Sequence, residues 1–239
     1  MNKRDRTKVF MAGLLIALTG VFAGGAWAGI SATKHNLSNG GTGTIKGDQT
    51  EICIFCHTPH DAIKNGNIPL WNKKLSEVAL YGVYTSPTMT ATDGADIGGA
   101  MSGGAITASA AVSNLCMSCH DGTVAINAFN NPSNLEAVPV MTGTTVDGKL
   151  LPGINSNLGT DLKNDHPVNF TYNTQLSTDD GFLKDPGPLG TGAGLPNGVK
   201  LFSNKVQCAS CHDPHTSTNG AFLRVSMSGS LLCQSCHSK

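Results

Sequence analysis

Hydrophobic positions are unevenly spread along this chain of 239 residues. Phe10 to Phe22 is mostly apolar, whereas Thr85 to Asn114 is small and polar and Asp185 to Gly198 is rich in proline and glycine. The two later stretches are typical of loops or linkers. Elsewhere the pattern supports only short elements, such as a helical turn after Cys119 through Phe129 and a strand around Val199 to Phe202. We therefore expect a mostly irregular fold with a few short helices and strands.

The beginning of the chain has the pattern of a signal peptide, which we assign to residues 1–28. Four basic residues precede the apolar run, and Ala26-Trp27-Ala28 is a small-x-small cleavage site. The alternative, an uncleaved membrane anchor, is disfavoured because the apolar run is shorter than the roughly 20 residues of a membrane span. No later segment is apolar enough to cross a membrane. We expect an exported chain that begins at Gly29.

The remaining chain is poor material for a conventional core. Aromatic residues make up 5% of the sequence, and glycine occurs 29 times. Residues 1–28 contain four of the 16 basic residues and one of the 16 acidic residues, so 12 basic and 15 acidic residues remain. This acidic balance makes nucleic acid an unsuitable partner. Candidate packing residues are Ile54, Phe55, Trp71, Val124, Ile126, Phe129, Phe222 and Leu223.

The pentapeptide Cys-x-x-Cys-His occurs four times and uses all eight cysteines. It is the attachment signature of c-type haem, in which the two thiols bind the haem and the histidine is the proximal iron ligand. We expect four covalently attached haems, forming a closely packed chain that supplies most of the core. A structural zinc site is the alternative use of paired cysteines. The four copies are Cys53-Ile54-Phe55-Cys56-His57, Cys116-Met117-Ser118-Cys119-His120, Cys208-Ala209-Ser210-Cys211-His212 and Cys233-Gln234-Ser235-Cys236-His237.

Four histidines lie outside these motifs, and their number matches the sixth ligands that four haems need. They are His35, His60, His166 and His215. Methionine is the usual rival for this position, and five methionines follow residue 28. Met117 is inside a motif, and Met89 and Met101 lie in stretches of small residues, so we favour four haems with two histidine ligands each.

His60 and His215 each follow a proximal histidine by three residues, in His-x-Pro-His. The backbones of two axial histidines lie on the order of 12 Å apart, whereas three residues span at most about 10–11 Å. Each of these histidines should therefore serve a neighbouring haem. A solvent-exposed histidine in a turn is the alternative.

The ligands repeat along the chain in the same order. The order is a free histidine, Cys-x-x-Cys-His-x-Pro-His, and Cys-x-x-Cys-His, and it occurs twice. We interpret residues 29–130 and 131–239 as two two-haem modules, the second with a long loop before its first haem. The repeat then assigns His60 to the Cys116/Cys119 haem and His215 to the Cys233/Cys236 haem. It leaves His35 for the Cys53/Cys56 haem and His166 for the Cys208/Cys211 haem.

The chain resembles the multihaem c-type cytochromes of metal-reducing bacteria, and more narrowly the extracellular tetrahaem cytochromes that polymerise into filaments. The segments that carry this resemblance include Lys34 to Ser38, Cys53 to His60, Pro69 to Asn72, Leu115 to Thr123, His166 to Val168, Cys208 to His215 and Phe222 to Arg224. The resemblance implies irregular structure, bis-histidine haems in a close line, and one distal histidine donated by a neighbouring subunit.

Three functions compete at this point. An electron conduit needs no open iron position, whereas a multihaem reductase needs a five-coordinate haem with acid–base groups nearby. The third function, metal storage or a structural zinc protein, follows from the zinc alternative. All motifs are complete and no distal histidine is missing, so we expect a non-enzymatic electron carrier. Its partners would be other redox proteins or extracellular electron acceptors, and its place the cell exterior or, alternatively, the periplasm.

The positions of the first and last ligands suggest a head-to-tail polymer. His35 is the seventh residue after the cleavage site, on an arm near the N-terminus, and His237 lies two residues from the end of the sequence. An arm with a ligand and a thinly covered haem can form a heterologous pair that repeats without closing. In that case His35 would serve a haem of the next subunit. A monomeric shuttle is the alternative.

Overall fold

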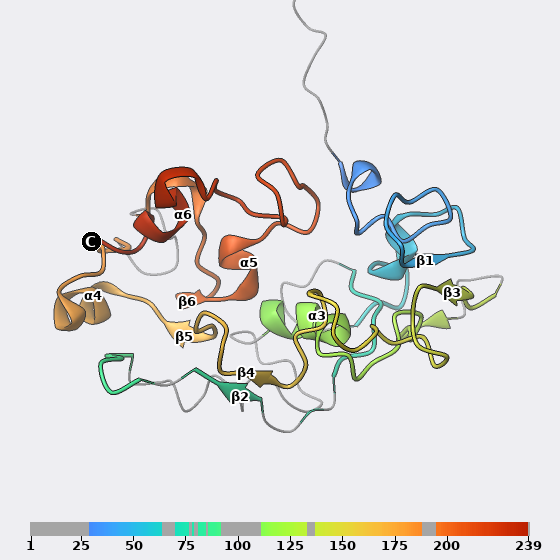
Figure 1. The fold of residues 1–239 in the computed structure, drawn as a ribbon, viewed down its shortest axis with the longest axis horizontal. Coiled ribbons are helices and arrows are strands. Elements are labelled where there is room, and N and C mark those ends of the chain that lie inside the picture. Colours follow the sequence, from blue (N-terminus) through green and yellow to red (C-terminus); the bar gives the residue numbers. More distant parts are fainter. Residues whose placement is uncertain are drawn as a thin grey trace, which may run out of the picture.

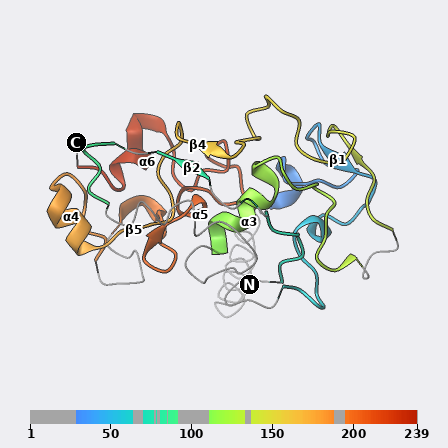
Figure 2. The same cartoon turned by 90° about the horizontal axis from the view of Figure 1, so that it is seen from below.

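The computed structural model describes residues 29–63, 70–76, 78, 81–84, 86–91, 111–132, 137–187 and 195–238. The predicted signal peptide, residues 1–28, lies outside the described residues, as does the stretch 92–110. The molecule is elongated, and long irregular segments connect its short elements (Figures 1 and 2). This is consistent with the expected fold class. Within the part of the chain that the structure describes, no helix is long and apolar enough to cross a membrane.

The helices are short. The longest, α3, carries the second Cys-x-x-Cys-His motif and lies in the middle of the molecule (Figure 1). The described helices are α3 (Ala111–His120), α4 (Thr174–Asp180), α5 (Cys208–Cys211) and α6 (Leu231–Gln234), with the 3-10 turns η1 (Ile30–Ala32), η2 (Cys53–Phe55), η4 (Pro196–Gly198) and η5 (Ser228–Ser230).

The described strands have two residues each and pair segments that are far apart in the sequence. β1 (Lys46–Gly47) pairs with β3 (Met141–Thr142) antiparallel, β2 (Gly82–Val83) with β4 (Asp161–Leu162) parallel, and β5 (Phe170–Thr171) with β6 (Lys205–Val206) antiparallel. Such short ladders add few hydrogen bonds. They act as cross-links between distant loops, and two of the three join the predicted halves 29–130 and 131–239.

The structure differs from both elements that the apolar pattern predicted, the helical turn after Cys119 and the strand from Val199 to Phe202. The helix around the second motif ends at His120, where the sequence pattern placed its start, because Gly122 adopts a positive φ of 68° that ends a helix. It begins at Ala111, within the stretch expected to be a loop. The predicted strand from Val199 to Phe202 is also absent, since the chain turns through positive φ at Ser203 and Asn204 and the strand β6 follows that turn.

The apolar side chains form a main cluster beside the last two motifs and a small one beside α3. The main cluster contains Phe170, Tyr172, Leu176, Leu195, Val199, Leu201, Val206 and Val225, and the small one Tyr81, Met117 and Leu162. Of the candidate packing residues, Phe55, Ile126 and Phe129 are buried, whereas Ile54, Trp71, Val124, Phe222 and Leu223 are half-buried.

Candidate haem-binding sites

Each Cys-x-x-Cys-His motif folds as a single helical turn. In the first, third and fourth motifs the N–H of the histidine donates to the carbonyl of the first cysteine, at 2.9, 3.1 and 2.9 Å. The second motif forms the last turn of α3. Residues three and four positions apart share one face of a helix, so this turn places both thiols and the imidazole on the same side. That is the arrangement needed to hold one haem.

Three of the four motifs are then clamped by the same pair of backbone hydrogen bonds. The carbonyl of the second cysteine accepts from a backbone N–H of a segment outside the motif. The N–H of the residue after the histidine donates to a backbone carbonyl of that same segment. The histidines and the residues opposite them are His57 with Trp71, His212 with Leu223, and His237 with Leu183. The second motif differs, because the His120 carbonyl accepts from the N–H of Leu158 at 2.7 Å. These bonds fix each proximal histidine to a distant part of the chain.

The clamps on the first and third motifs share an unusual backbone conformation. Leu70 and Phe222 both adopt a positive φ, 54° and 58°, at the residue before the one opposite the histidine. Bulky side chains rarely adopt this conformation, which costs on the order of 1–3 kcal/mol. Both motifs are also the ones followed by Pro-His, so the structure adds a backbone signature to the sequence repeat.

None of the eight cysteines forms a disulfide, and the Cys116 and Cys208 side chains are hydrogen-bonded to each other. Burial, with the neighbouring Cys119 adding to it, raises the pKa of Cys56 to about 12. A thiol–thiol hydrogen bond raises the pKa of Cys116 and lowers that of Cys208. Burial and the proximity of Cys211 raise the pKa of Cys236 to about 11. Electrostatic neighbours thus link the first motif to the second, the second to the third, and the third to the fourth.

Three proximal histidines face a histidine from outside the motifs. The ring centres of His35 and His120 are 6.0 Å apart, those of His57 and His215 are 6.3 Å apart, and those of His166 and His237 are 6.5 Å apart. Two nitrogen–metal bonds of about 2 Å, with the distance from each nitrogen to its ring centre, together span about 6.3 Å. The spacing in all three pairs therefore fits one iron between two imidazoles.

The Nδ1 atoms of several histidines contact acceptor oxygens, which leaves Nε2 for a metal. Such a contact fixes the tautomer and orients the ring of a metal-binding histidine. The contacts join His35 to the Pro214 carbonyl (3.1 Å), His120 to the Ser156 carbonyl (2.7 Å), His166 to the Pro167 carbonyl (2.8 Å), and His212 to the Ala221 carbonyl (2.9 Å).

His35 is the most enclosed of the histidines outside the motifs. Its ring stacks on Phe222 with ring centres 4.1 Å apart, and burial lowers its pKa to about 4. Burial also lowers the pKa of His120, which it faces. Neutral imidazole is the form that binds a metal, so both side chains are prepared for that role.

At the first motif, the indole nitrogen of Trp71 is positioned as a hydrogen-bond donor for a bound haem. The indole of Trp71 stands edge-on to the His57 ring, with centres 5.9 Å apart, and its buried Nε1 has no hydrogen-bond partner within the protein. A buried donor of this kind normally has an acceptor. A haem carboxylate would supply one. Sequence reasoning named Trp71 only as a packing residue.

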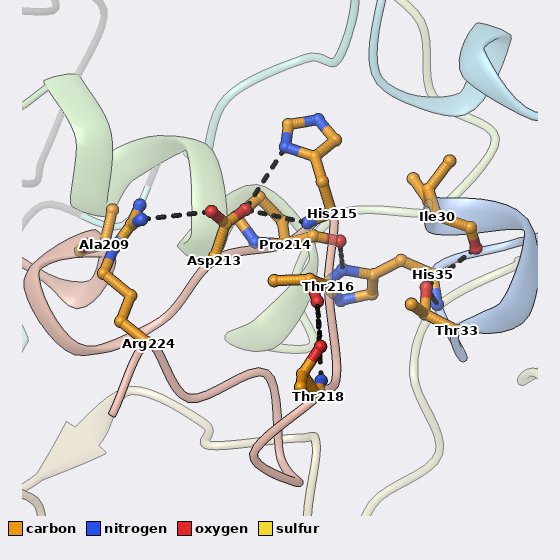
Figure 3. A network of polar contacts seen from close by, with 10 residues as sticks. All are labelled: Ile30, Thr33, His35, Ala209, Asp213, Pro214, His215, Thr216, Thr218 and Arg224. Carbon is orange, nitrogen blue, oxygen red and sulfur yellow. Dashed lines mark hydrogen bonds and ion pairs between the residues drawn. The ribbon is translucent and has the colours of Figure 1, made fainter. Parts of the chain in front are cut away.

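The ring contacts do not follow the predicted pairing within modules. His215 was assigned to the fourth motif but faces His57 of the first, and His166 faces His237 instead of His212. His35 faces His120 within its own chain. The ring contacts cross between the halves because the loop from Asp213 to Thr216 lies against residues of the first half (Figure 3). The assignment of each histidine to a haem stays a prediction. The exclusion of a haem's own His-x-Pro-His histidine is compatible with these pairs.

Sequence reasoning also missed the polar groups behind the second motif. The buried Asp121 accepts from the Tyr81 hydroxyl and from the Thr123 hydroxyl, both at 2.8 Å. The Ser76 hydroxyl lies 2.8 Å from the Tyr81 oxygen and donates to it, because the single phenolic hydrogen goes to Asp121. These contacts lie directly after His120 and hold the turn that ends α3. The only available signal was an aspartate next to a motif histidine.

Comparison with known families gives one match. Residues 201–239 match the family described as Doubled CXXCH motif. The matched segment contains the third and fourth attachment motifs. No curated protein matches the chain. The match supports a multihaem c-type cytochrome with covalently attached haem c and a role in electron transport. Cytochromes of this kind are typically exported.

Proposed function

We propose that the chain is an exported tetrahaem cytochrome that carries electrons along a line of bis-histidine haems. The observation that carries this proposal is the set of three ring pairs, each with one motif histidine and one outside histidine at 6.0–6.5 Å. Six of the eight histidines belong to these three pairs, and we assign the remaining two, His60 and His212, to the fourth pair. Each bound haem would supply a one-electron couple whose potential depends on its axial ligands and surroundings.

The ligands argue for a carrier instead of a reductase. Two histidines on one iron leave no position for a substrate. Bis-histidine ligation also favours lower potentials than histidine–methionine ligation. Among the methionines, Met117 is fully buried beside Tyr81 and Leu162, which supports its role as a packing residue.

The order of the attachment points supports a continuous path for electrons. The first motif lies near one end of the molecule and the fourth near the other, with α3 and α5 between them (Figures 1 and 2). A hydrogen bond between Cys116 and Cys208 joins the second and third motifs, and Cys56 with Cys119 and Cys211 with Cys236 are electrostatic neighbours across the other two steps. The chain thus holds its haem sites in a row.

We assign a second copy of this chain as the partner, in a head-to-tail filament. Exposed apolar side chains occur at both ends of the long axis. Val138, Val140 and Val146 flank β3 at one end, and Phe182, Met227 and Leu231 lie beside α4 and α6 at the other. Exposed apolar residues of this kind mark association surfaces. Two different surfaces at opposite ends form a heterologous contact, which repeats without closing when the rotation between subunits does not return to the start. The resemblance to filament-forming cytochromes points the same way and supports a position outside the cell.

Two measurements on the purified native protein test these proposals. Reduced protein with four bis-histidine haems should bind no carbon monoxide, and a full equivalent of binding would favour the reductase. Electron micrographs should show filaments. A uniform population of single particles would instead favour the soluble periplasmic shuttle, without affecting the ligand scheme.

A further inference from the structure

The loop after the third motif touches ligands of more than one site (Figure 3). His212 is the proximal histidine of that motif, and His215 faces His57 of the first motif. The carbonyl of Pro214, between them, accepts from Nδ1 of His35, which faces His120. Asp213 completes the loop, and its side chain points back toward His215.

Arg224 fixes the carboxylate of Asp213. Its Nη1 donates to Oδ2 of Asp213 at 3.0 Å, and its Nε donates to the carbonyl of Ala209 in α5 at 2.7 Å. The Arg224 side chain is 13% exposed and that of Asp213 28%. Because the guanidinium is anchored at both points, the carboxylate cannot rotate freely.

The second oxygen of this carboxylate is directed at His215. Oδ1 of Asp213 accepts from the backbone N–H of His215 at 3.1 Å and lies 3.4 Å from its Nδ1. The first contact alone is an ordinary turn formed by an aspartate. The second places an anion behind the imidazole. Four other histidines, His35, His120, His166 and His212, have a neutral backbone carbonyl at Nδ1.

The equivalent position of the first His-x-Pro-His is not acidic. Thr58 stands there, and its hydroxyl donates to the carbonyl of His60 at 2.9 Å. The repeat therefore tolerates a residue without charge. A carboxylate at position 213 is not needed to form the loop.

We propose that Asp213 is a positioning residue that acts through His215. It orients the ring and, as an anionic partner at Nδ1, strengthens the donation of His215 to the iron. An anionic partner raises the basicity of a metal-binding histidine, which stabilises the oxidised iron and lowers its reduction potential. The haem served by His215, the Cys53/Cys56 haem in the pairing above, is therefore held at a lower potential than it would have with a neutral partner. This inference rests on the bis-histidine scheme of the proposed function.

The test is a redox titration of the haem-loaded protein, with Asp213→Asn as the main variant. Asparagine keeps an oxygen that can accept from the His215 N–H, so the turn is preserved while the charge is removed. We expect one of the titrating components to move upward, with about a tenfold change in its reduced-to-oxidised ratio at fixed potential, or 59 mV for a one-electron couple. Asp213→Thr, which copies the first repeat, should give a shift of the same sign. Asp147→Asn, an exposed carboxylate paired with Lys149, is the matched control and should shift nothing.

A third variant, His215→Met, identifies the component. It should raise the potential of the haem that His215 serves, because methionine ligation raises potentials. If Asp213→Asn moves the same component, the inference stands. If His215→Met moves one component and Asp213→Asn moves none or another, the inference about Asp213 fails and the ligand scheme survives. If His215→Met changes neither the potentials nor the low-spin spectrum, the pairing of the proposed function fails instead.

Discussion

At the scale of single residues, histidine chemistry in this protein depends on what lies behind each ring. The imidazoles of His35, His120 and His166 each have a backbone carbonyl at Nδ1, whereas His215 has a carboxylate. The carbonyl contacts come from Pro214, Ser156 and Pro167. These partners are backbone atoms, so the pattern of side chains in the sequence does not predict them.

His166→Ala should open one haem to an external ligand. His166 faces His237, so its loss leaves one axial position of the Cys233/Cys236 haem empty. The carbon monoxide difference spectrum of the reduced variant should show binding equal to one haem in four. Asp165→Asn, the neighbouring change, should leave all haems six-coordinate. Carbon monoxide binding unchanged from the unsubstituted protein would contradict the His166–His237 pair.

Lys73→Met should destabilise the protein. The Lys73 side chain is 1% exposed, and its ammonium donates to the carbonyls of Ala125 and Ile126 at 2.6 and 2.8 Å. Methionine fills similar space but removes the ammonium from the buried Ile126 carbonyl, at a cost of about 1–3 kcal/mol, whereas the Ala125 carbonyl still accepts from the N–H of Ala128 at 3.0 Å. Denaturant unfolding of the haem-loaded protein measures this loss. Lys74 is exposed, so Lys74→Met should change the free energy of unfolding by less than about 0.5 kcal/mol. Equal effects of the two changes would refute a buried role for Lys73.

At the scale of elements, a buried polar network joins α3 to α5. The hydroxyl of Ser113 in α3 donates to Oε1 of Gln207 and accepts from the N–H of Cys208 at 3.2 Å. Nε2 of Gln207 donates to Oδ1 of Asn169 at 2.8 Å. Ser113, Gln207 and Asn169 are at most 1% exposed. Because Cys116 and Cys208 lie in these two helices, the network fixes the spacing of the second and third attachment sites.

Gln207→Leu should therefore weaken the contact between the two helices. The change removes partners from two buried side chains, and the expected loss is about 1–3 kcal/mol of unfolding free energy. Thermal or denaturant unfolding of the haem-loaded protein gives the value. Gln175→Leu is the control, since Gln175 is an exposed residue of α4 whose amide donates to Asp179 at 2.7 Å. A neutral result for Gln207→Leu would show that the network does not hold the helices together.

Among the elements, sequence patterns predict the local geometry of the motifs but not the conformation of the short apolar runs. Each motif forms its helical turn as one five-residue unit, so the local geometry of the sites was predictable. The strand expected at Val199 to Phe202 failed because the backbone there is decided by the turn at Ser203 and Asn204 and by packing against β5. Short apolar runs do not distinguish between a strand and a buried loop.

At the scale of the whole molecule, the two ends differ in the residues that they expose. Val140 is 67% exposed beside β3, and Phe182 is 52% exposed after α4. The elements that carry the second and third attachment motifs, α3 and α5, lie between these ends (Figure 1). Both features belong to the proposed head-to-tail assembly, in which one end of a subunit meets the other end of the next.

Val140→Asp should prevent filament assembly without changing the haems. A charge in an apolar contact is costly to bury, whereas the residue touches none of the attachment sites. Electron microscopy would report assembly and the absorption spectrum the haem content. Tyr84→Asp places the same charge at an exposed site next to β2, away from both ends, and should leave filaments intact. Normal filaments from the Val140 variant would exclude this end surface as the contact.

The chain should not hold its fold without haem. The apolar clusters are small, the described strands have two residues each, and the sequence is rich in glycine. Cofactor binding then supplies folding free energy that the polypeptide lacks. A chain in which all motif cysteines are replaced by alanine should be digested rapidly by protease, in contrast to the haem-loaded protein. Equal resistance of the two forms would show that the polypeptide has a sufficient core of its own.

The sequence by itself determined the chemistry of each attachment site. Cysteine, cysteine and histidine at positions one, four and five share one side of a helical turn wherever that turn forms, so the motif carries its own geometry. The reach of three residues likewise predicts that His60 and His215 serve haems other than those of their own motifs. Both conclusions depend only on distances along a short stretch of backbone.

Only the tertiary structure decided which histidines face each other. His57 and His215 come from opposite halves of the chain, and so do His35 and the Pro214 carbonyl that holds it. The same is true of Lys73 and the carbonyls it caps across 52 and 53 residues. These partners meet because long loops close through a few cross-links such as β1–β3 and the clamps on the motifs. Closing a loop costs entropy that rises only slowly with its length, so sequence spacing favours no one pairing over another, and the packing of the folded chain makes the choice.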